Sequence, residues 1–134
     1  MRCSAWRLIS DVKVLTAKAT VRQNTLLIDT VCDFRAADEY IVRYFSKSAG
    51  NCKVLRVYNK KRRASTVSSD VVKFCLVKDG CFVDPCRRDI LESKIILTTM
   101  VTSLQLTELE LQGCFTHILI DEAAQVHSTT VLLF

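Results

Sequence analysis

The stretch Phe115-Thr116-His117-Ile118-Leu119-Ile120-Asp121-Glu122-Ala123-Ala124-Gln125 decides the fold that we expect for this chain. Residues 116–120 form a nearly continuous apolar run after a turn at Gln112-Gly113, which predicts a strand buried on both faces. Asp121 and Glu122 follow at the carboxyl end of that strand. Open parallel sheets bind ligands at the carboxyl ends of their strands, so the two acids mark a candidate site.

The two adjacent carboxylates suit the chemistry of nucleotide hydrolysis. Mg²⁺ takes oxygen ligands and commonly shares them with substrate phosphates. Asp121 can hold such an ion, and Glu122 can orient and deprotonate an attacking water, as in nucleotide-hydrolysing domains. Adjacent acids also occur in solvated loops and in first turns of helices. The apolar strand before them and Ala-Ala-Gln after them favour the functional interpretation.

Composition indicates one ordinary globular domain. The chain has 134 residues, of which 49 % are hydrophobic and 25 % charged. The net charge of +5 is a modest preference for anionic partners. The seven cysteines include no Cys-x-x-Cys pair, which argues against zinc and for reduced thiols in a cytoplasmic or, as the alternative, a nuclear protein. No run approaches the ~20 apolar residues of a membrane span, so we expect no membrane partner.

Apolar runs alternate with helical patterns along the chain, which predicts an α/β domain with a mainly parallel sheet and flanking helices. Strands are expected at residues 25–29, 52–58, 94–99 and 116–120, and helices at 1–23, 36–46, 70–76 and 85–91. A further short helix or turn is expected from Thr102-Ser103 to Leu111, with four leucines covering the sheet: Leu104, Leu106, Leu109 and Leu111.

Three polar segments have open interpretations. Thr98 and Thr99 end a strand, where their hydroxyls could either reach a phosphate or simply reflect the β-propensity of threonine. Asp38-Glu39 favours the exposed first turn of a helix. Lys60-Lys61-Arg62-Arg63 is the densest charge on the chain, and it fits a solvated loop, a phosphate contact or a nuclear signal.

The sequence His-Ile-Leu-Ile-Asp-Glu-Ala-Ala-Gln at 117–125 resembles motif II, the Walker B box, of superfamily 1 RNA helicases. The Asp-Glu-Ala-Ala-Gln variant is similar to the up-frameshift-like group, and most of all to the "helicase with zinc finger domain" family. The resemblance spans about residues 25–125. It implies that residues 1–134 are part of a first RecA-like (P-loop NTPase) motor domain that lacks the P-loop strand. In that scheme 1–23 is a helix, 24–125 runs from motif Ia to motif II, and 126–134 is a truncated tail.

The resemblance also implies roles for individual residues. Asp121 would bind the nucleotide through Mg²⁺, Glu122 would be the catalytic base, and Gln125 would sense the γ-phosphate of ATP. RNA would be the second ligand, with ribonucleoprotein components as further partners. The residues implied to face the nucleic acid are Thr30, Thr98 and Thr99.

The sequence departs from the family pattern in two places. It contains no Gly-x-x-x-x-Gly-Lys-Ser/Thr, the loop that cradles phosphates. After Thr30, residues 31–35 are one residue too many for motif Ia and lack its Asn. We therefore expect a piece of an ATP-dependent RNA helicase motor that is inactive alone. The alternative is a non-catalytic truncated product or a remnant that binds RNA or protein.

Overall fold

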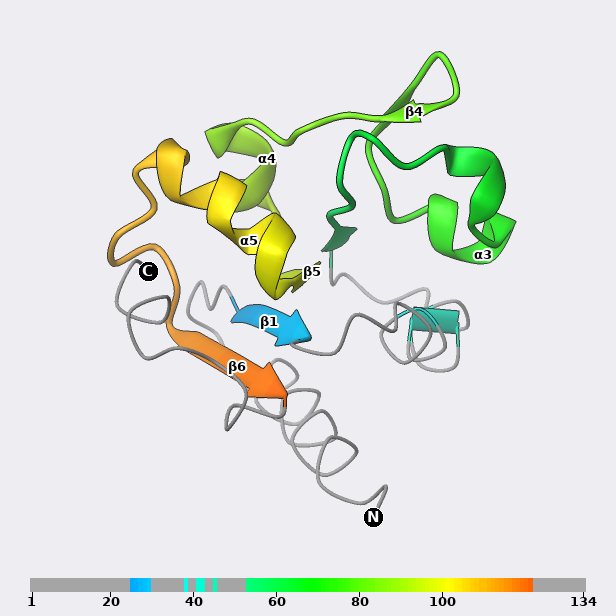
Figure 1. Ribbon diagram of the computed structural model, residues 1–134. Coiled ribbons are helices and arrows are strands. Elements are labelled where there is room, and N and C mark those ends of the chain that lie inside the picture. Colours follow the sequence, from blue (N-terminus) through cyan, green and yellow to red (C-terminus); the bar gives the residue numbers. More distant parts are fainter. Residues whose placement is uncertain (1–24, 30–37, 39–40, 43–44, 46–52, 122–134) are drawn as a thin grey trace.

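The computed structural model describes residues 25–29, 38, 41–42, 45 and 53–121 (Figure 1). The expected helix at 1–23 and the tail at 126–134 lie outside these residues. The strands are β1 (Thr25–Asp29), β2 (Val54–Arg56), β3 (Val77–Lys78), β4 (Cys81–Phe82), β5 (Ile95–Thr99) and β6 (His117–Asp121). The helices are η1 (Ala64–Thr66), α3 (Ser69–Val72), α4 (Arg87–Glu92), α5 (Met100–Leu106) and η2 (Thr107–Leu109).

Four of the strands form one sheet in the order β2-β5-β1-β6, and every neighbouring pair is parallel. The α/β class and the parallel sheet are therefore confirmed. The four expected strands are all present, and β1 has the predicted bounds. Their order was not predicted, because β5 enters between β2 and β1 although both precede it in the chain.

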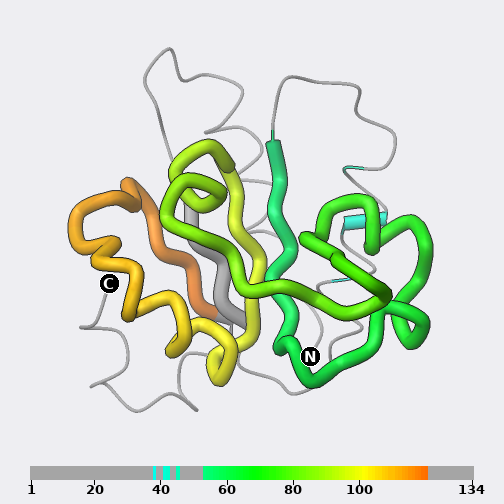
Figure 2. The backbone as a smooth tube through the Cα atoms, turned by 90° about the horizontal axis from the view of Figure 1, so that it is seen from above, coloured from blue at the N-terminus to red at the C-terminus, as the bar shows by residue number. Residues whose placement is uncertain are grey.

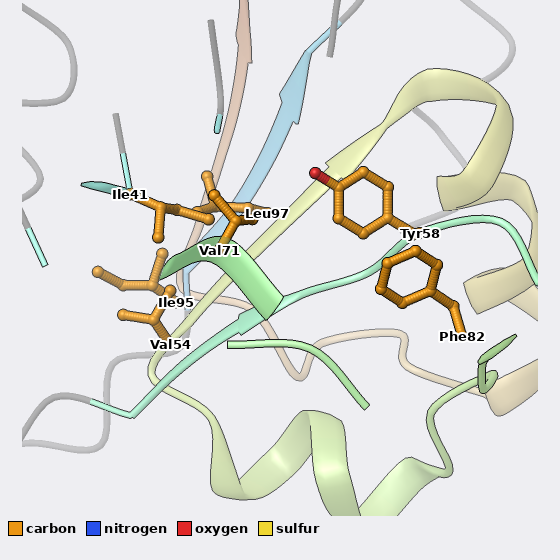
Figure 3. Close-up of a cluster of buried hydrophobic side chains, with 7 residues drawn as sticks. All are labelled: Ile41, Val54, Tyr58, Val71, Phe82, Ile95 and Leu97. Atoms are coloured by element: carbon orange, nitrogen blue, oxygen red, sulfur yellow. The ribbon is translucent and has the colours of Figure 1, made fainter. Parts of the chain in front are cut away.

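Each face of the sheet has its own hydrophobic core. On one face β2 and β5 pack against helical Ile41 and against Val71 of α3, in the cluster of Figure 3: Ile41, Val54, Tyr58, Val71, Phe82, Ile95 and Leu97. On the other face α4 and α5 cover the alternate residues, in a second cluster: Leu55, Val57, Ile90, Ile96, Leu106 and Leu111. The period of two along β2 and β5 thus separates two buried faces.

Local sequence explains the connection between β2 and β5. The Ser68 side chain accepts a hydrogen bond from the Asp70 N–H and caps α3, as a serine at that position should. Asp79 and Gly80 have φ angles of 52° and 75° and join β3 to β4. Two consecutive positive φ values in a two-residue loop are the geometry that Asp-Gly favours in hairpins. This hairpin was not predicted.

Three expectations around the sheet were wrong. The helix after β5 begins at Met100 rather than near Thr102, because Thr99 caps it directly at the strand end. Leu104 is 44 % exposed and does not cover the sheet, whereas Leu106 and Leu111 do. The strand at 116–120 was expected to be buried on both faces. Among the described strands β6 is at the sheet edge, and its residues 117–120 are only partly buried.

Candidate functional site

The carboxyl ends of β5, β1 and β6 meet at one level of the sheet. Asp29 is the register partner of Thr99 on one side and of Asp121 on the other. The same register aligns Thr25, Ile95 and His117 at the opposite, amino edge. Three oxygen-bearing residues from three separate segments are thus brought to one edge, where open parallel sheets bind ligands.

The sequence-predicted acids are placed only in part. Asp121 is the last residue of β6, so it lies at the carboxyl edge as expected. Glu122, Gln125 and Thr30 lie outside the described residues. Thr30 directly follows Asp29, and Glu122 directly follows Asp121, so both continue from strands that end at this edge.

Thr98 and Thr99 are both present at the edge, and both hydroxyls already have partners within the protein. Thr99 Oγ1 lies 3.0 Å from Thr102 Oγ1, to which it donates, and it accepts from the Thr102 N–H at 3.4 Å. Thr98 is 1 % exposed and its hydroxyl donates to the Thr99 carbonyl at 3.3 Å. Thr99 therefore caps α5, a role that the sequence did not indicate. Contact of these hydroxyls with RNA stays a prediction.

The loop that leads into β6 is fixed to α4. The Arg87 guanidinium donates to the carbonyls of Leu109, at 3.2 Å, and of Glu110. Glu110 has a φ of 52°, and Gly113, at 72°, completes the turn before the strand. These bonds set the point from which β6 starts and so help to position Asp121 at its far end.

Sequence reasoning missed a buried polar cluster formed by Asp38, Arg56 and Tyr58. Arg56 Nε donates to Asp38 Oδ1 at 3.1 Å, and the Tyr58 hydroxyl donates to the same oxygen. The Arg56 side chain is fully buried and its guanidinium lies 4.2 Å from the centre of the Tyr58 ring. The exposed position expected for Asp38 was wrong, since only 18 % of its side chain is accessible. The overlooked signal was Arg56, an arginine inside the apolar run of β2. An arginine buried at such a position needs a carboxylate partner.

Tyr58 in the cluster and Cys75 beside it both have raised pKa values. Burial raises the pKa of Tyr58 above its usual value of 10.0, and the Asp38 carboxylate adds to this, while Arg56 opposes it. Burial also raises the pKa of the Cys75 thiol from 9.0 to about 12, with Arg56 again opposing. Both groups therefore stay neutral at physiological pH, and Cys75 is a structural thiol rather than a nucleophile.

The carboxyl edge offers ligands of the type that Mg²⁺ prefers. Carboxylates and a hydroxyl are hard oxygen donors, and Asp29, Asp121 and Thr99 share one register level. Within the described part of the chain, no group of three or more His, Cys, Asp or Glu side chains is arranged to hold a metal ion. Asp29 and Asp121 are acidic residues on neighbouring strands, which is the residue type that binds a cation shared with substrate phosphates. No helix among the described residues is long and apolar enough to cross a membrane.

Comparison with known proteins gives the chain its relatives. It is 39 % identical over 111 residues to the human protein "Probable helicase with zinc finger domain". The matched segment covers 78 % of this chain and 6 % of that protein. The zebrafish protein of the same name is 41 % identical over 97 residues, covering 67 % of this chain and 5 % of its relative. The human "3'-5' exoribonuclease HELZ2" is 36 % identical over 98 residues, covering 68 % of this chain and 3 % of that protein.

Two other comparisons found nothing. No family model matches the chain, and no solved structure matches it. The curated relatives confirm the resemblance that motif II suggested, and the chain spans about 6 % of the length of the first of them. The chain is thus homologous to a segment of the helicases with zinc finger domain.

Proposed function

We propose that this chain forms part of a RecA-like motor domain of an ATP-dependent RNA helicase and contributes its motif II. One observation carries the proposal. The strand that ends in Asp121 runs parallel to β1 and β5, in a register that aligns its end with Asp29 and Thr99. A motif II strand must deliver its carboxylates to the ligand-binding edge of a parallel sheet, and β6 has this direction and position.

The roles proposed for individual residues rest on the resemblance of 117–125 to motif II. Asp121 holds Mg²⁺, and Glu122 accepts the proton of the attacking water. Gln125 contacts the γ-phosphate, and Thr30 with the Thr98-Thr99 pair lies on the side that faces RNA. The bound ion would neutralise charge on the phosphates of ATP. The contributions of the described residues are a strand that ends at Asp121 and a loop before it that is held by Arg87.

The chain has no phosphate cradle in its sequence, so we expect weak nucleotide binding and no turnover from these 134 residues. The test must therefore detect weak binding at a defined place. Mn²⁺ can replace Mg²⁺ at oxygen sites and broadens the amide signals of nearby residues in NMR spectra. With Mn²⁺ and ATP added to the labelled chain, we expect broadening at Asp29, Thr99 and Asp121.

The register supplies an internal control for this experiment. Thr25, Ile95 and His117 belong to the same three strands at the opposite edge. Because paramagnetic broadening falls steeply with distance, their signals should broaden much less than those at the carboxyl edge. Asp121→Asn should remove the broadening, whereas Glu108→Gln, which neutralises an exposed acid on η2, should leave it unchanged. Equal broadening at both edges, or none at the carboxyl edge, would refute the proposed site.

The alternative is a non-catalytic segment that binds RNA or protein. It is favoured by one specific observation, the set of exposed cations between β2 and β4. The two functions separate in the same experiment. A non-catalytic RNA-binding segment binds RNA but shows no Mn²⁺-dependent and ATP-dependent broadening at Asp121.

A further inference from the structure

We propose that Lys61, Arg63 and Lys78 form a basic ridge that binds the phosphate backbone of single-stranded RNA. The ridge deepens the proposed function, on which the choice of RNA as ligand rests. The sequence alone left the Lys60–Arg63 run open between a solvated loop, a phosphate contact and a nuclear signal. The structure separates the four cations of that run and adds a fifth, Lys78, from the hairpin.

Strand pairing places two of the ridge cations on one face. Arg63 forms an antiparallel bridge with Cys81, and Cys81 is the register partner of Lys78. Side chains directly opposite each other in paired strands point to the same face, so Arg63, Cys81 and Lys78 form a row. All three residues are exposed. The next residue of β4, Phe82, is buried and points the opposite way, with its ring 4.6 Å from that of Tyr58.

The backbone under the ridge is held in place. Lys61 N–H donates to Asn59 Oδ1 at 2.9 Å, and Ala64 N–H donates to the Gly80 carbonyl at 3.1 Å. Arg62, between the two ridge residues of this turn, lies with its guanidinium 4.9 Å from the centre of the Tyr58 ring. Arg62 is thus used to anchor the turn, while Lys61 and Arg63 on either side of it remain exposed.

Among the described residues, the ridge cations differ from their neighbours in their lack of ion pairs. Of the five cations in this region, Lys60 is paired with Asp84 at 3.1 Å and Arg62 contacts Tyr58 and Thr66. The structure gives no ion pair within its described residues to the three that make up the ridge. A fixed row of exposed, unpaired cations attracts a polyanion and releases its counterions on binding.

The position of the ridge relative to the sheet agrees with a role in a helicase motor. The turn at 59–62 follows β2, whose neighbour β5 ends at Thr99, and Figure 2 shows this turn at the same end of the molecule as the start of α5. In the sheet order β2 and β6 are at opposite edges. The carboxyl end of the sheet therefore has acids on the β6 side and cations on the β2 side, which would keep Mg²⁺-bound nucleotide and RNA apart.

The chemistry of the ridge predicts binding without base preference. Base stacking needs exposed aromatic side chains, and contacts to phosphates carry no sequence information. The nearby aromatic residues, Tyr58 and Phe82, are only 2 % and 3 % exposed. We therefore expect oligouridylate and oligoadenylate to bind within about threefold of each other, with a strong dependence on salt.

The test is a fluorescence-anisotropy titration of the full chain with a short labelled oligouridylate over a series of salt concentrations. Replacing Lys61, Arg63 and Lys78 by alanine should weaken binding roughly tenfold at low salt and reduce the salt slope by about 2, because each single-strand phosphate contact contributes about 0.7. The matched control replaces Lys53, Arg88 and Lys94 by alanine. These are three exposed cations near the amino edge, and removing them leaves the same net charge without touching the ridge.

The outcomes are separable. Equal weakening by both triple variants, or an unchanged slope in the ridge variant, would overturn the ridge and leave motif II untouched. Tighter binding of polyglutamate than of oligouridylate at equal charge would instead make the ridge a protein-docking surface. Far-UV circular dichroism of both variants shows whether the fold is retained. Loss of the Mn²⁺ effect at Asp121 would overturn the proposed nucleotide site without affecting the RNA result.

Discussion

Removing the Asp38 carboxylate tests whether the buried cluster holds the first face of the sheet together. Asp38→Ala leaves the Arg56 guanidinium, fully buried, without the carboxylate that faces it. Breaking a buried ion pair by deleting one partner costs about 3–5 kcal/mol, since the remaining charge is uncompensated.

The remaining contacts of Arg56 place the expected loss near the lower end of that range. Its Nη1 still donates to the carbonyls of Val57 and Leu97, each at 3.4 Å, and the Tyr58 ring still lies below it. Its Nη2, which has no hydrogen-bond partner among the described residues, gains none. We therefore expect a loss of about 3 kcal/mol in the free energy of unfolding. That is a large part of the roughly 5–15 kcal/mol that stabilises an ordinary domain.

Urea denaturation followed by far-UV circular dichroism measures this loss. The matched control is Asp84→Ala, which removes an exposed ion pair with Lys60 and should cost less than about 1 kcal/mol. Combining Asp38→Leu with Arg56→Met replaces both charges by apolar groups and should recover part of the loss. Recovery stays incomplete because the buried Tyr58 hydroxyl loses its Asp38 acceptor. A cost below about 1 kcal/mol for Asp38→Ala, or a double variant no more stable than Asp38→Ala, would show that burial of the arginine is not the cause.

Three further predictions concern other parts of the chain. Because the folded protein keeps the Cys75 proton up to about pH 12 while an unfolded thiol loses it near 9.0, stability should fall as the pH rises above about 9; urea titrations at several pH values should show a smaller fall for Cys75→Ala. Gly80→Ala should cost about 1–2 kcal/mol in the same assay, because the φ of +75° strains any residue with a Cβ although no atom lies within 4 Å of it. Finally, the chain should release no phosphate from ATP above the level of Glu122→Gln, and turnover above that control would contradict the need for a phosphate cradle.

The strands of the main sheet were predictable because strands buried in a parallel sheet consist of nearly continuous apolar residues. Residues 25–29 and 94–99 each carry an uninterrupted apolar segment that ends in polar residues, and both became strands within one residue of the expected bounds. The position of Asp121 followed from the same pattern, since a strand that ends in an acid places that acid at its carboxyl end.

The start of α5 depends on a capping hydrogen bond, which the spacing of apolar residues does not reveal. Apolar spacing put the helix start near Thr102, but the Thr99 hydroxyl accepts from the Thr102 N–H and starts the helix directly after β5. The cap competes with any role of that hydroxyl toward a ligand, and only the packed structure shows which contact is made.

The sequence by itself therefore determined the four strands of the main sheet, their parallel α/β class and the acid at the carboxyl end of β6. Only the tertiary structure decided that β5 lies between β2 and β1, that Arg56 is buried against Asp38, and that Arg63 and Lys78 share a face. The physical reason is the distance along the chain over which each kind of contact acts. Apolar patterning reports how each segment meets the core, whereas strand order, ion pairing and cross-strand rows depend on distant partners. Such partners lie 18 residues apart along the chain in the case of Arg63 and Cys81, and 70 residues apart in the case of Thr25 and Ile95.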